Sequence, residues 1–488
     1  MMSQELSKAR AYEEKEGDKV PSEQRPLFHL SPRIGWMNDP NGFSFYKGKY
    51  HLFYQYYPYD KKWGPMHWGH AVSGDLLSWE YLPAAMAPDT EADRGGCFSG
   101  SAAELPDGRQ LLLYTGVIPQ GNDYVQMQCA AIGDGTDYEK CRNNPLITQS
   151  QVPSFSNHHD FRDPKIFSEK DGGYGLVAVD CMENRLGRVL YYRSPDGLDW
   201  KFRSILSEND GTFGRMWECP DFFELDGTHV LLVNPMDMRT TETYYSGNGT
   251  VCMIGTFSES DGTFHAEKDQ PIDCGIDFYA AQTMIAPDNR RIMTAWMQNW
   301  DTISYVGETL PWCGQMITPR ELHVKDGRLI QQPVREIEAL RRETVHYEKQ
   351  RISEKTTLEG VSGRTAELLI EIEPAEEGSF SSFEIRLAEK DDTYTSLIFD
   401  PLHSMFSFNR SFSGSVRNVA HERRCRIPDR NGHLSLRILL DRFSCEVFLN
   451  GGEQAVSHVL YTDADAEGIS FSAEGCADLT ITCFRLSR

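Results

Sequence analysis

The sequence predicts an all-β fold, a five-bladed β-propeller followed by a C-terminal β-sandwich. A repeat of about sixty residues occupies most of the first two thirds of the 488-residue chain. The last third alternates apolar and polar residues with a period of two, which is typical of half-buried strands. A single hydrophobic core rarely extends beyond about 300 residues, so a chain of this length is expected to form two domains.

Residues 1–25 form a charged N-terminal extension without the apolar run of a secretory signal. No apolar stretch approaches the roughly 20 residues of a membrane span, so a cytoplasmic protein without a membrane partner is expected. The formal net charge of −23 argues against nucleic acid and anionic membrane surfaces as partners. The 12 cysteines include no Cys-x-x-Cys pair, which favours reduced, buried thiols over disulfides or a zinc site.

The repeat predicts the propeller. Four segments combine an Asp or Gly turn with an aromatic residue, and the aromatics lie 59, 62 and 64 residues apart. Units of short strands with such a period are typical of propeller blades, although evenly spaced, independent hairpins are the alternative. A fifth unit fits around "DFYAAQTMIAPDNRRIMTAWMQNW" and "GRLIQQP", so five blades are expected over residues 26–332. The four segments are "SGDLLSWEYL", "IGDGTDYEKC", "SPDGLDWKFR" and "SESDGTFHAE", with the aromatics Trp79, Tyr138, Trp200 and Phe264.

The remaining residues predict a linker and a second all-β domain. The stretch "VREIEALRRETVHYEK" has apolar residues at helical spacing, so a helical linker is expected over residues 333–345. Strands follow, of which "HLSLRILL" places its apolar residues on one face and "SCEVFLNGGEQAVSHVLY" turns at Asn-Gly-Gly. Residues 346–488 are therefore predicted to form a β-sandwich, and a homo-oligomer formed through this sandwich stays open.

Three acidic residues occur at the predicted starts of blades. Asp39 lies in "WMNDPNG", Asp163 in "FRDPK" and Glu218 in "WECPD", while Phe98 in "CFSGSA" takes the corresponding place in the second blade. Because Asp-Pro-Asn-Gly is also a turn sequence, a turn alone would explain Asp39. Equivalent positions of the inner strands of a propeller converge on the central channel, so the three carboxyl groups are expected to meet in one pocket.

Carboxyl groups in one pocket can hydrolyse a glycosidic bond. A retaining hydrolase uses an ionised carboxylate as nucleophile and a protonated carboxyl as acid, about 5 Å apart. Backbone donors of the Asp-Pro-Asn-Gly turn would keep Asp39 ionised, which favours it as the nucleophile. Glu218, next to Trp217 and close to other acids, is favoured as the proton donor. Arg162 would keep the neighbouring Asp163 ionised for binding sugar hydroxyls.

Four motifs in order, "WMNDPNG", "FSGSA", "FRDP" and "WECPD", make the chain similar to the β-fructosidases of glycoside hydrolase family 32. The resemblance extends over nearly the whole chain after residue 25. It implies Asp39 as the nucleophile, Glu218 as acid and then base, and Asp163 with Arg162 as the groups that hold fructose hydroxyls and stabilise the transition state. The residues that it implies as lining of the sugar subsite, each with a purely structural role as the alternative, are Trp36, Asn38, Gln55, Trp63, Phe98, Ser99 and Trp296.

The resemblance implies release of terminal β-D-fructofuranosyl units from a small-molecule sugar: sucrose, sucrose 6-phosphate or a short fructo-oligosaccharide. No cofactor and no metal are expected. A fructosyltransferase on the same scaffold and a non-catalytic fructan-binding propeller are the alternatives. Although His158, His159 and Asp160 could suggest a metal site, a polar loop before a strand is expected there, and Cys219 is expected to serve packing.

Overall fold

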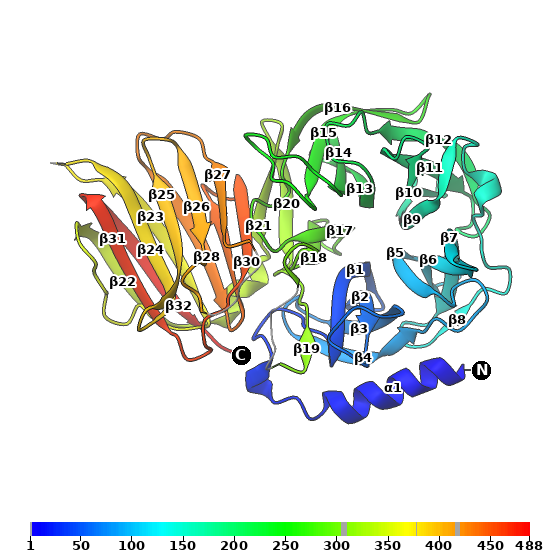
Figure 1. The fold of residues 1–488 in the computed structure, drawn as a ribbon, viewed down its shortest axis with the longest axis horizontal. Helices are drawn as coiled ribbons and strands as arrows, with labels where there is room; N and C mark the ends of the chain where they lie inside the picture. Colours follow the sequence, from blue (N-terminus) through cyan, green and yellow to red (C-terminus); the bar gives the residue numbers. More distant parts are fainter. Residues whose placement is uncertain (1, 304–309, 377, 415–419) are drawn as a thin grey trace.

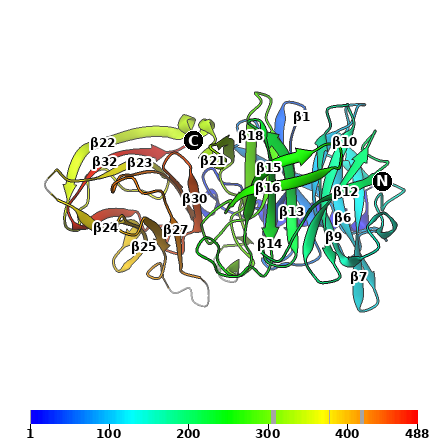
Figure 2. The same cartoon turned by 90° about the horizontal axis from the view of Figure 1, so that it is seen from above.

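The computed structural model describes residues 2–303, 310–376, 378–414 and 420–488. They form an all-β molecule, as the sequence predicts, with five sheets around a central axis and two further sheets packed beside them (Figure 1). The turned view separates the propeller from the sandwich (Figure 2). None of the helices in these ranges has the length and apolar character needed to span a bilayer.

Each propeller blade contains four antiparallel strands, and the first strand of each blade lies nearest the axis (Figure 1). Blade 1 comprises β1 (Gly35–Tyr46), β2 (Lys49–Tyr57), β3 (His67–Ser73) and β4 (Trp79–Met86). Blade 2 comprises β5 (Gly96–Glu104), β6 (Gln110–Gln120), β7 (Asp123–Gly133) and β8 (Tyr138–Lys140). Blade 3 comprises β9 (Ser156–Ser168), β10 (Tyr174–Met182), β11 (Gly187–Ser194) and β12 (Lys201–Glu208). Blade 4 comprises β13 (Trp217–Leu225), β14 (Thr228–Pro235), β15 (Val251–Ser258) and β16 (Thr263–Gln270).

Blade 5 and a short additional strand complete the ring. The additional strand, β19 (Trp312–Cys313), pairs in parallel with β1, so a late segment of the propeller is attached to its first blade. Blade 5 comprises β17 (Tyr279–Ile285), β18 (Arg291–Trp296), β20 (Arg320–Lys325) and β21 (Arg328–Pro333).

The inner strand of every blade carries a β-bulge. A bulge places extra residues opposite a shorter partner segment, bends the strand and changes the direction of its side chains. Asp163, Cys219 and Ala280 occupy equivalent bulge positions and have positive φ values of 61°, 47° and 57°. Asp-Pro-Asn-Gly does not form the expected turn but continues β1 through two irregularities in register. The bulged residues are Asn38 and Asp39 on β1, Ser99 on β5, Asp163 and Pro164 on β9, Cys219 and Pro220 on β13, and Ala280 and Ala281 on β17.

The N-terminal extension contains an α-helix, α1 (Gln4–Gly17), beside β4 at the outer edge of blade 1 (Figure 1). Leu6, Ala9 and Glu13 are buried on the helix, and the Ala84 amide donates to Glu13 Oε1 over 2.7 Å. The charged sequence has too few apolar residues to predict this helix from periodicity. Two short 3-10 helices also precede blade 3, η1 (Ser22–Gln24) and η2 (Gln149–Gln151).

The C-terminal domain is a sandwich of two antiparallel sheets whose facing apolar side chains form one core. The predicted linker is helical only in part, because η4 (Arg335–Leu340) is a 3-10 helix and β22 already begins at Arg341. The buried Val334, Ile337 and Leu340 are spaced by three, which is the period of a 3-10 helix. One sheet comprises β22 (Arg341–Ile352), β32 (Ala477–Leu486), β23 (Ala366–Pro374), β28 (Leu434–Asp441), β29 (Ser444–Leu449) and β30 (Gln454–Val459). The other comprises β27 (Glu422–Arg426), β26 (Met405–Asn409), β25 (Thr393–Asp400), β24 (Phe380–Lys390) and β31 (Gly468–Gly475).

A buried network of charges joins the sandwich to the propeller. The Asp441 carboxylate accepts hydrogen bonds from the backbone amides of residues 27–29 and contacts His29 Nδ1 over 2.8 Å. Glu446 contacts His29 Nε2 over 2.9 Å and Arg320 Nη2 over 2.6 Å, and Arg320 Nη1 donates to Asp273 over 2.9 Å. Burial alone would lower the pKa of His29, but the hydrogen bonds and charges of Asp441 and Glu446 raise it to about 9. His29 is therefore charged at neutral pH in the folded protein.

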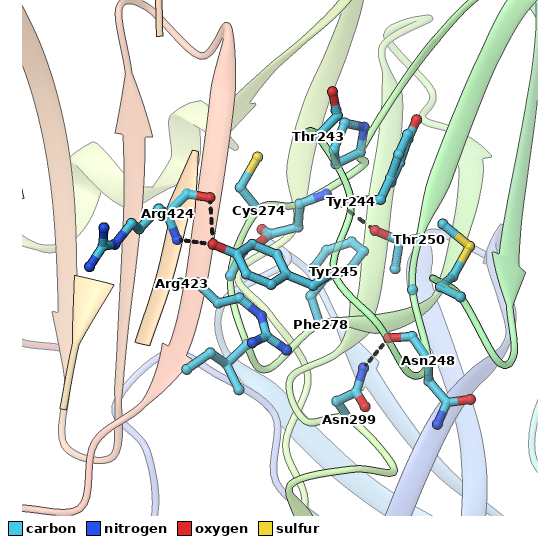
Figure 3. A pocket seen from close by; sticks show the side chains of 16 residues that line it. Thr243, Tyr244, Tyr245, Asn248, Thr250, Cys274, Phe278, Asn299, Arg423 and Arg424 are labelled. Carbon is cyan, nitrogen blue, oxygen red and sulfur yellow. Dashed lines mark hydrogen bonds between the residues drawn. The ribbon is translucent and has the colours of Figure 1, made fainter. Parts of the chain in front are cut away.

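A pocket of about 50 Å³ lies in the same seam between the propeller and the sandwich (Figure 3). The Tyr245 hydroxyl accepts a hydrogen bond from the Arg424 amide over 2.7 Å and donates one to the Arg424 carbonyl over 3.1 Å. The Arg423 guanidinium lies 4.3 Å from the centroid of the Tyr245 ring. Asn299 Nδ2 donates to the Asn248 carbonyl over 2.9 Å. The pocket has room for a few water molecules, and its side chains hold the β14–β15 loop against β27.

Candidate active site

Asp39 lies in the bulge of β1, where side chains bind both of its carboxylate oxygens. Ser99 Oγ donates to Oδ2 over 2.7 Å, and Asn38 Nδ2 donates to Oδ1 over 3.0 Å. The backbone donors expected from a turn are replaced by these two side chains because the segment is a strand. Burial, and next the charge of Glu218, raise the pKa of Asp39, whereas the hydrogen bonds from Ser99 and Asn38 lower it.

Cys219 connects the three predicted carboxyl groups. It follows Glu218 directly, and its backbone amide donates to Asp163 Oδ2 over 2.9 Å. Its thiol donates to Asp39 Oδ2 over 3.5 Å. The packing role that the sequence predicts is therefore incomplete, because Cys219 packs against the apolar cluster around Trp36 and also bonds two acids. Asp39, Asp163 and Glu218 thus belong to one site.

Arg162, Glu218 and Tyr279 occupy the same register position on three successive inner strands, each just before a bulge. Arg162 donates to Glu218 Oε1 from Nε over 3.3 Å and from Nη2 over 3.2 Å. The Tyr279 hydroxyl donates to Glu218 Oε2 over 2.6 Å. Both oxygens of Glu218 are therefore held. Sequence reasoning missed Tyr279, although "DFYAAQ" places it in line with Arg162 and Glu218 once the strands are aligned by register.

Burial opposes the ionised state that is expected for Asp163. Arg162 Nε lies 3.9 Å from Asp163 Oδ2, whereas Arg162 Nη1 donates to Asp160 Oδ1 over 2.6 Å. Burial, together with the charge of Glu218, raises the pKa of Asp163 to about 7, although the charge of Arg162 lowers it. Arg162 offsets this effect only in part, because its guanidinium also bonds Asp160 and Glu218.

Trp36 and Trp296 pack in a buried aromatic cluster beside the acids. Trp300, which sequence reasoning missed, completes the cluster, with its ring centroid 6.0 Å from that of Trp36 and 5.1 Å from that of Trp296. Trp36 Nε1 donates to Asn38 Oδ1 over 2.7 Å. Because Asn38 in turn binds Asp39, the aromatic cluster positions the Asp39 carboxylate.

Gln55, Trp63 and Phe98 lie on the side of the cluster formed by blades 1 and 2. Gln55 is buried on β2, and its Nε2 donates to the Cys97 carbonyl over 3.0 Å. Trp63 is 49% exposed in the β2–β3 loop, and its ring meets that of Phe98 edge to face at 6.0 Å. Phe98 immediately precedes Ser99, which binds Asp39. Phe98 and the half-exposed Trp63 therefore lie next to the site on a side that solvent reaches.

Beneath the acids, the propeller axis is filled by polar side chains. Lys165, Asp221 and Gln282 occupy equivalent positions just after the bulges of β9, β13 and β17. Lys165 Nζ lies 3.1 Å from Asp221 Oδ2, and Gln282 Nε2 donates to the Gly100 carbonyl over 3.0 Å. These contacts join blade 3 to blade 4 and blade 5 to blade 2.

His158, His159 and Asp160 lie within β9 and not in the expected loop before a strand. The side chain of His158 lies outside the described part of the structure, and Asp160 binds Arg162. Within the described ranges, no three His, Cys, Asp or Glu side chains form a group that could hold a metal ion.

Comparisons with known proteins cover both domains. Residues 29–333 match the model of the glycosyl hydrolases family 32 N-terminal domain, and residues 336–484 match that of the family 32 C terminal. The chain is 38% identical to raffinose invertase of Escherichia coli, over 98% of each chain. It is 34% identical to sucrose-6-phosphate hydrolase of Zymomonas mobilis, over 97% of this chain and 94% of that protein.

Solved structures give the same result. The beta-fructofuranosidase BmSUC1 of Bombyx mori superposes with a TM-score of 0.84 at 34% identity, covering 99% of this chain and 98% of that one. Sucrose-6-phosphate hydrolase from Lactobacillus gasseri superposes with a TM-score of 0.85 at 26% identity, covering 100% and 97%. These matches confirm the resemblance that the four motifs indicate. The chain therefore belongs to glycosyl hydrolase family 32 and is a glycosidase.

Proposed function

We propose that this glycosidase is a retaining β-fructofuranosidase. It releases terminal β-D-fructofuranosyl units from sucrose, sucrose 6-phosphate or short fructo-oligosaccharides. The observation that carries the proposal is the grouping of Asp39, Asp163 and Glu218 around Cys219. The substrate class is supported by the names of the relatives, raffinose invertase and sucrose-6-phosphate hydrolase, and by a Bombyx mori variant whose structure contains sucrose.

The proposed reaction has two steps. Asp39 attacks the anomeric carbon of the fructosyl unit while Glu218 gives its proton to the leaving oxygen, so the glycosidic bond breaks and an ester forms. Glu218 then takes a proton from water, which attacks the same carbon and frees Asp39. Ser99 and Asn38 hold the Asp39 carboxylate in place during both steps.

The charges of Asp39 and Glu218 are coupled in the proposed first step. After burial, the charge of Glu218 is the main cause of the raised pKa of Asp39. When Glu218 holds its proton, this repulsion is absent and Asp39 ionises more easily. The pair therefore favours holding one proton between its two carboxyl groups, and the reactive form in the proposed mechanism is the one in which Glu218 carries that proton.

The other residues of the site bind the sugar. Asp163 accepts hydrogen bonds from fructose hydroxyls and, together with Arg162, stabilises the charged transition state. The aromatic faces of Trp63 and Phe98 offer apolar area to a sugar ring at the open side of the cluster. The residues proposed to line the fructose subsite are Trp36, Asn38, Gln55, Trp63, Phe98, Ser99 and Trp296.

The first fructose released is expected to be the β-furanose anomer. If the carboxyl groups of Asp39 and Glu218 lie about 5 Å apart, no water fits between the acid and the anomeric carbon, and two successive inversions retain the configuration. Proton NMR of the products in the first moments of hydrolysis, before mutarotation, distinguishes the anomers. An initial α-furanose product would show inversion and would remove Asp39 as nucleophile.

The proposed setting is the cytoplasm, where the enzyme acts on imported sugars. All twelve cysteines are free thiols, and one of them, Cys219, bonds Asp39 inside the site. Free thiols are maintained in a reducing compartment, which supports this location.

A further inference from the structure

Asp160 is an acid beside the site, and it takes no part in the two proposed reaction steps. Its Oδ1 accepts a hydrogen bond from Arg162 Nη1 over 2.6 Å, while the contacts of Arg162 with Glu218 are 3.2 and 3.3 Å long. Asp160 is thus a closer partner of Arg162 than Glu218 is. The side chains of Arg162 and Asp160 are 9% and 27% exposed, so solvent screens the pair only in part.

The Arg162 guanidinium bonds two carboxyl groups that need opposite protonation states. Glu218, as the proton donor, must keep its proton until the leaving oxygen takes it. A positive charge in contact with Glu218 favours its ionised form and would release that proton at lower pH. Asp160 has no such requirement, and as a carboxylate it neutralises the charge of Arg162.

We propose that Asp160 is a positioning residue which, through Arg162, keeps the proton on Glu218 up to higher pH. The inference rests on the proposed role of Glu218 as the acid. Asp160 holds one arm of the guanidinium, so Arg162 contacts Glu218 with its other two nitrogens at longer distance. The arginine can then bind the sugar and the transition state without depleting the acid form of Glu218.

Other groups also face Glu218, and the replacement of Asp160 leaves them in place. Tyr279 on β17 donates to Glu218 Oε2 over 2.6 Å. The carboxyl groups of Asp39 on β1 and Asp163 on β9 and the thiol of Cys219 on β13 also interact with Glu218 electrostatically. Because all of these groups are shared between the variant and the wild type, a change in the pH profile reports on Asp160 and Arg162.

The test is the pH dependence of kcat/KM on sucrose for the wild type, Asp160→Asn and Asp160→Glu. Asp160→Asn is expected to move the alkaline limb to lower pH by about one unit, since an uncompensated neighbouring cation shifts a carboxyl titration by that order. Asp160→Glu, which restores the charge, is expected to bring the limb back toward that of the wild type. Asp210→Asn, an exposed acid in the β12–β13 loop, is the matched control and should leave the limb unchanged.

A second substrate separates the proton donor from other causes. On a fructoside with an activated leaving group, which needs no proton, the alkaline limb is expected to be weak in the wild type and unmoved in Asp160→Asn. A lower kcat or a higher KM with an unmoved limb on sucrose would show that Asp160 is only structural. If Asp160→Asn does not fold, Asp160→Ser is measured in the same way. Absence of fructose release by the wild type would refute the proposed function itself, and with it this inference.

Discussion

Asp39→Asn is expected to lower kcat on sucrose by several orders of magnitude while the protein stays folded. The amide cannot form the ester that the first step requires, and removal of a nucleophile costs far more than a factor of ten. The amide keeps the size of the carboxyl group, and Ser99 and Asn38 remain beside it, so the melting temperature should change little. Steady-state release of fructose and circular dichroism measure the two effects.

Glu218→Gln provides the companion measurement. The amide cannot donate the proton, so kcat on sucrose is also expected to fall by several orders of magnitude, but activity on an activated fructoside should partly return. Asp107→Asn, an exposed acid of the turn between β5 and β6, is the control and should retain full activity. Retention of more than about a tenth of wild-type activity by Asp39→Asn would exclude it as nucleophile.

Arg320→Leu is expected to lower the free energy of unfolding by about 3–5 kcal/mol. The replacement leaves Glu446 and Asp273 buried without the cation that binds both of them. Urea denaturation followed by fluorescence and calorimetry measures the loss. A buried charge that loses its partner is costly because the interior does not solvate it.

Arg335→Leu is the matched control for the stability measurement. Its side chain is 65% exposed and pairs with Glu321, so solvent screens the pair and its removal should destabilise the protein far less than that of Arg320. Similar small losses in Arg335→Leu and Arg320→Leu would contradict a stabilising role of the buried network.

The fold could be predicted because its repeat consists of residues that each blade needs for its own turns and packing. The turns use Asp and Gly, and four of the five blades place an aromatic residue after such a turn, so the period can be recognised in a single sequence. Helix α1 could not be predicted, since its face buries few side chains and one of them is Glu13. The linker is helical over only part of the predicted range, and its apolar spacing of three fits a 3-10 helix as well as an α-helix.

The sequence predicts that the three acids lie near one another, but it does not predict how the inner strands are aligned. As acids at predicted blade starts, Glu218 and Asp163 appear equivalent in the sequence, whereas the strand register places Glu218 in line with Arg162 and Tyr279. Each bulge adds residues to one strand only, and a shift of one residue points a side chain to the opposite face. The sequence therefore does not identify Tyr279 as a partner of Glu218, or Asp160 as a partner of Arg162.

The bonds from Asp441 to the segment before β1 also set an order of events during synthesis. The amide of Leu27 binds a carboxylate that lies 414 positions later in the chain. During synthesis, the first blade therefore leaves the ribosome long before Asp441 has been added to the chain. Residues 27–29 cannot form these hydrogen bonds until β28 and β29 have been synthesised and the sandwich has folded. Only then can the Leu27 amide bind the Asp441 carboxylate.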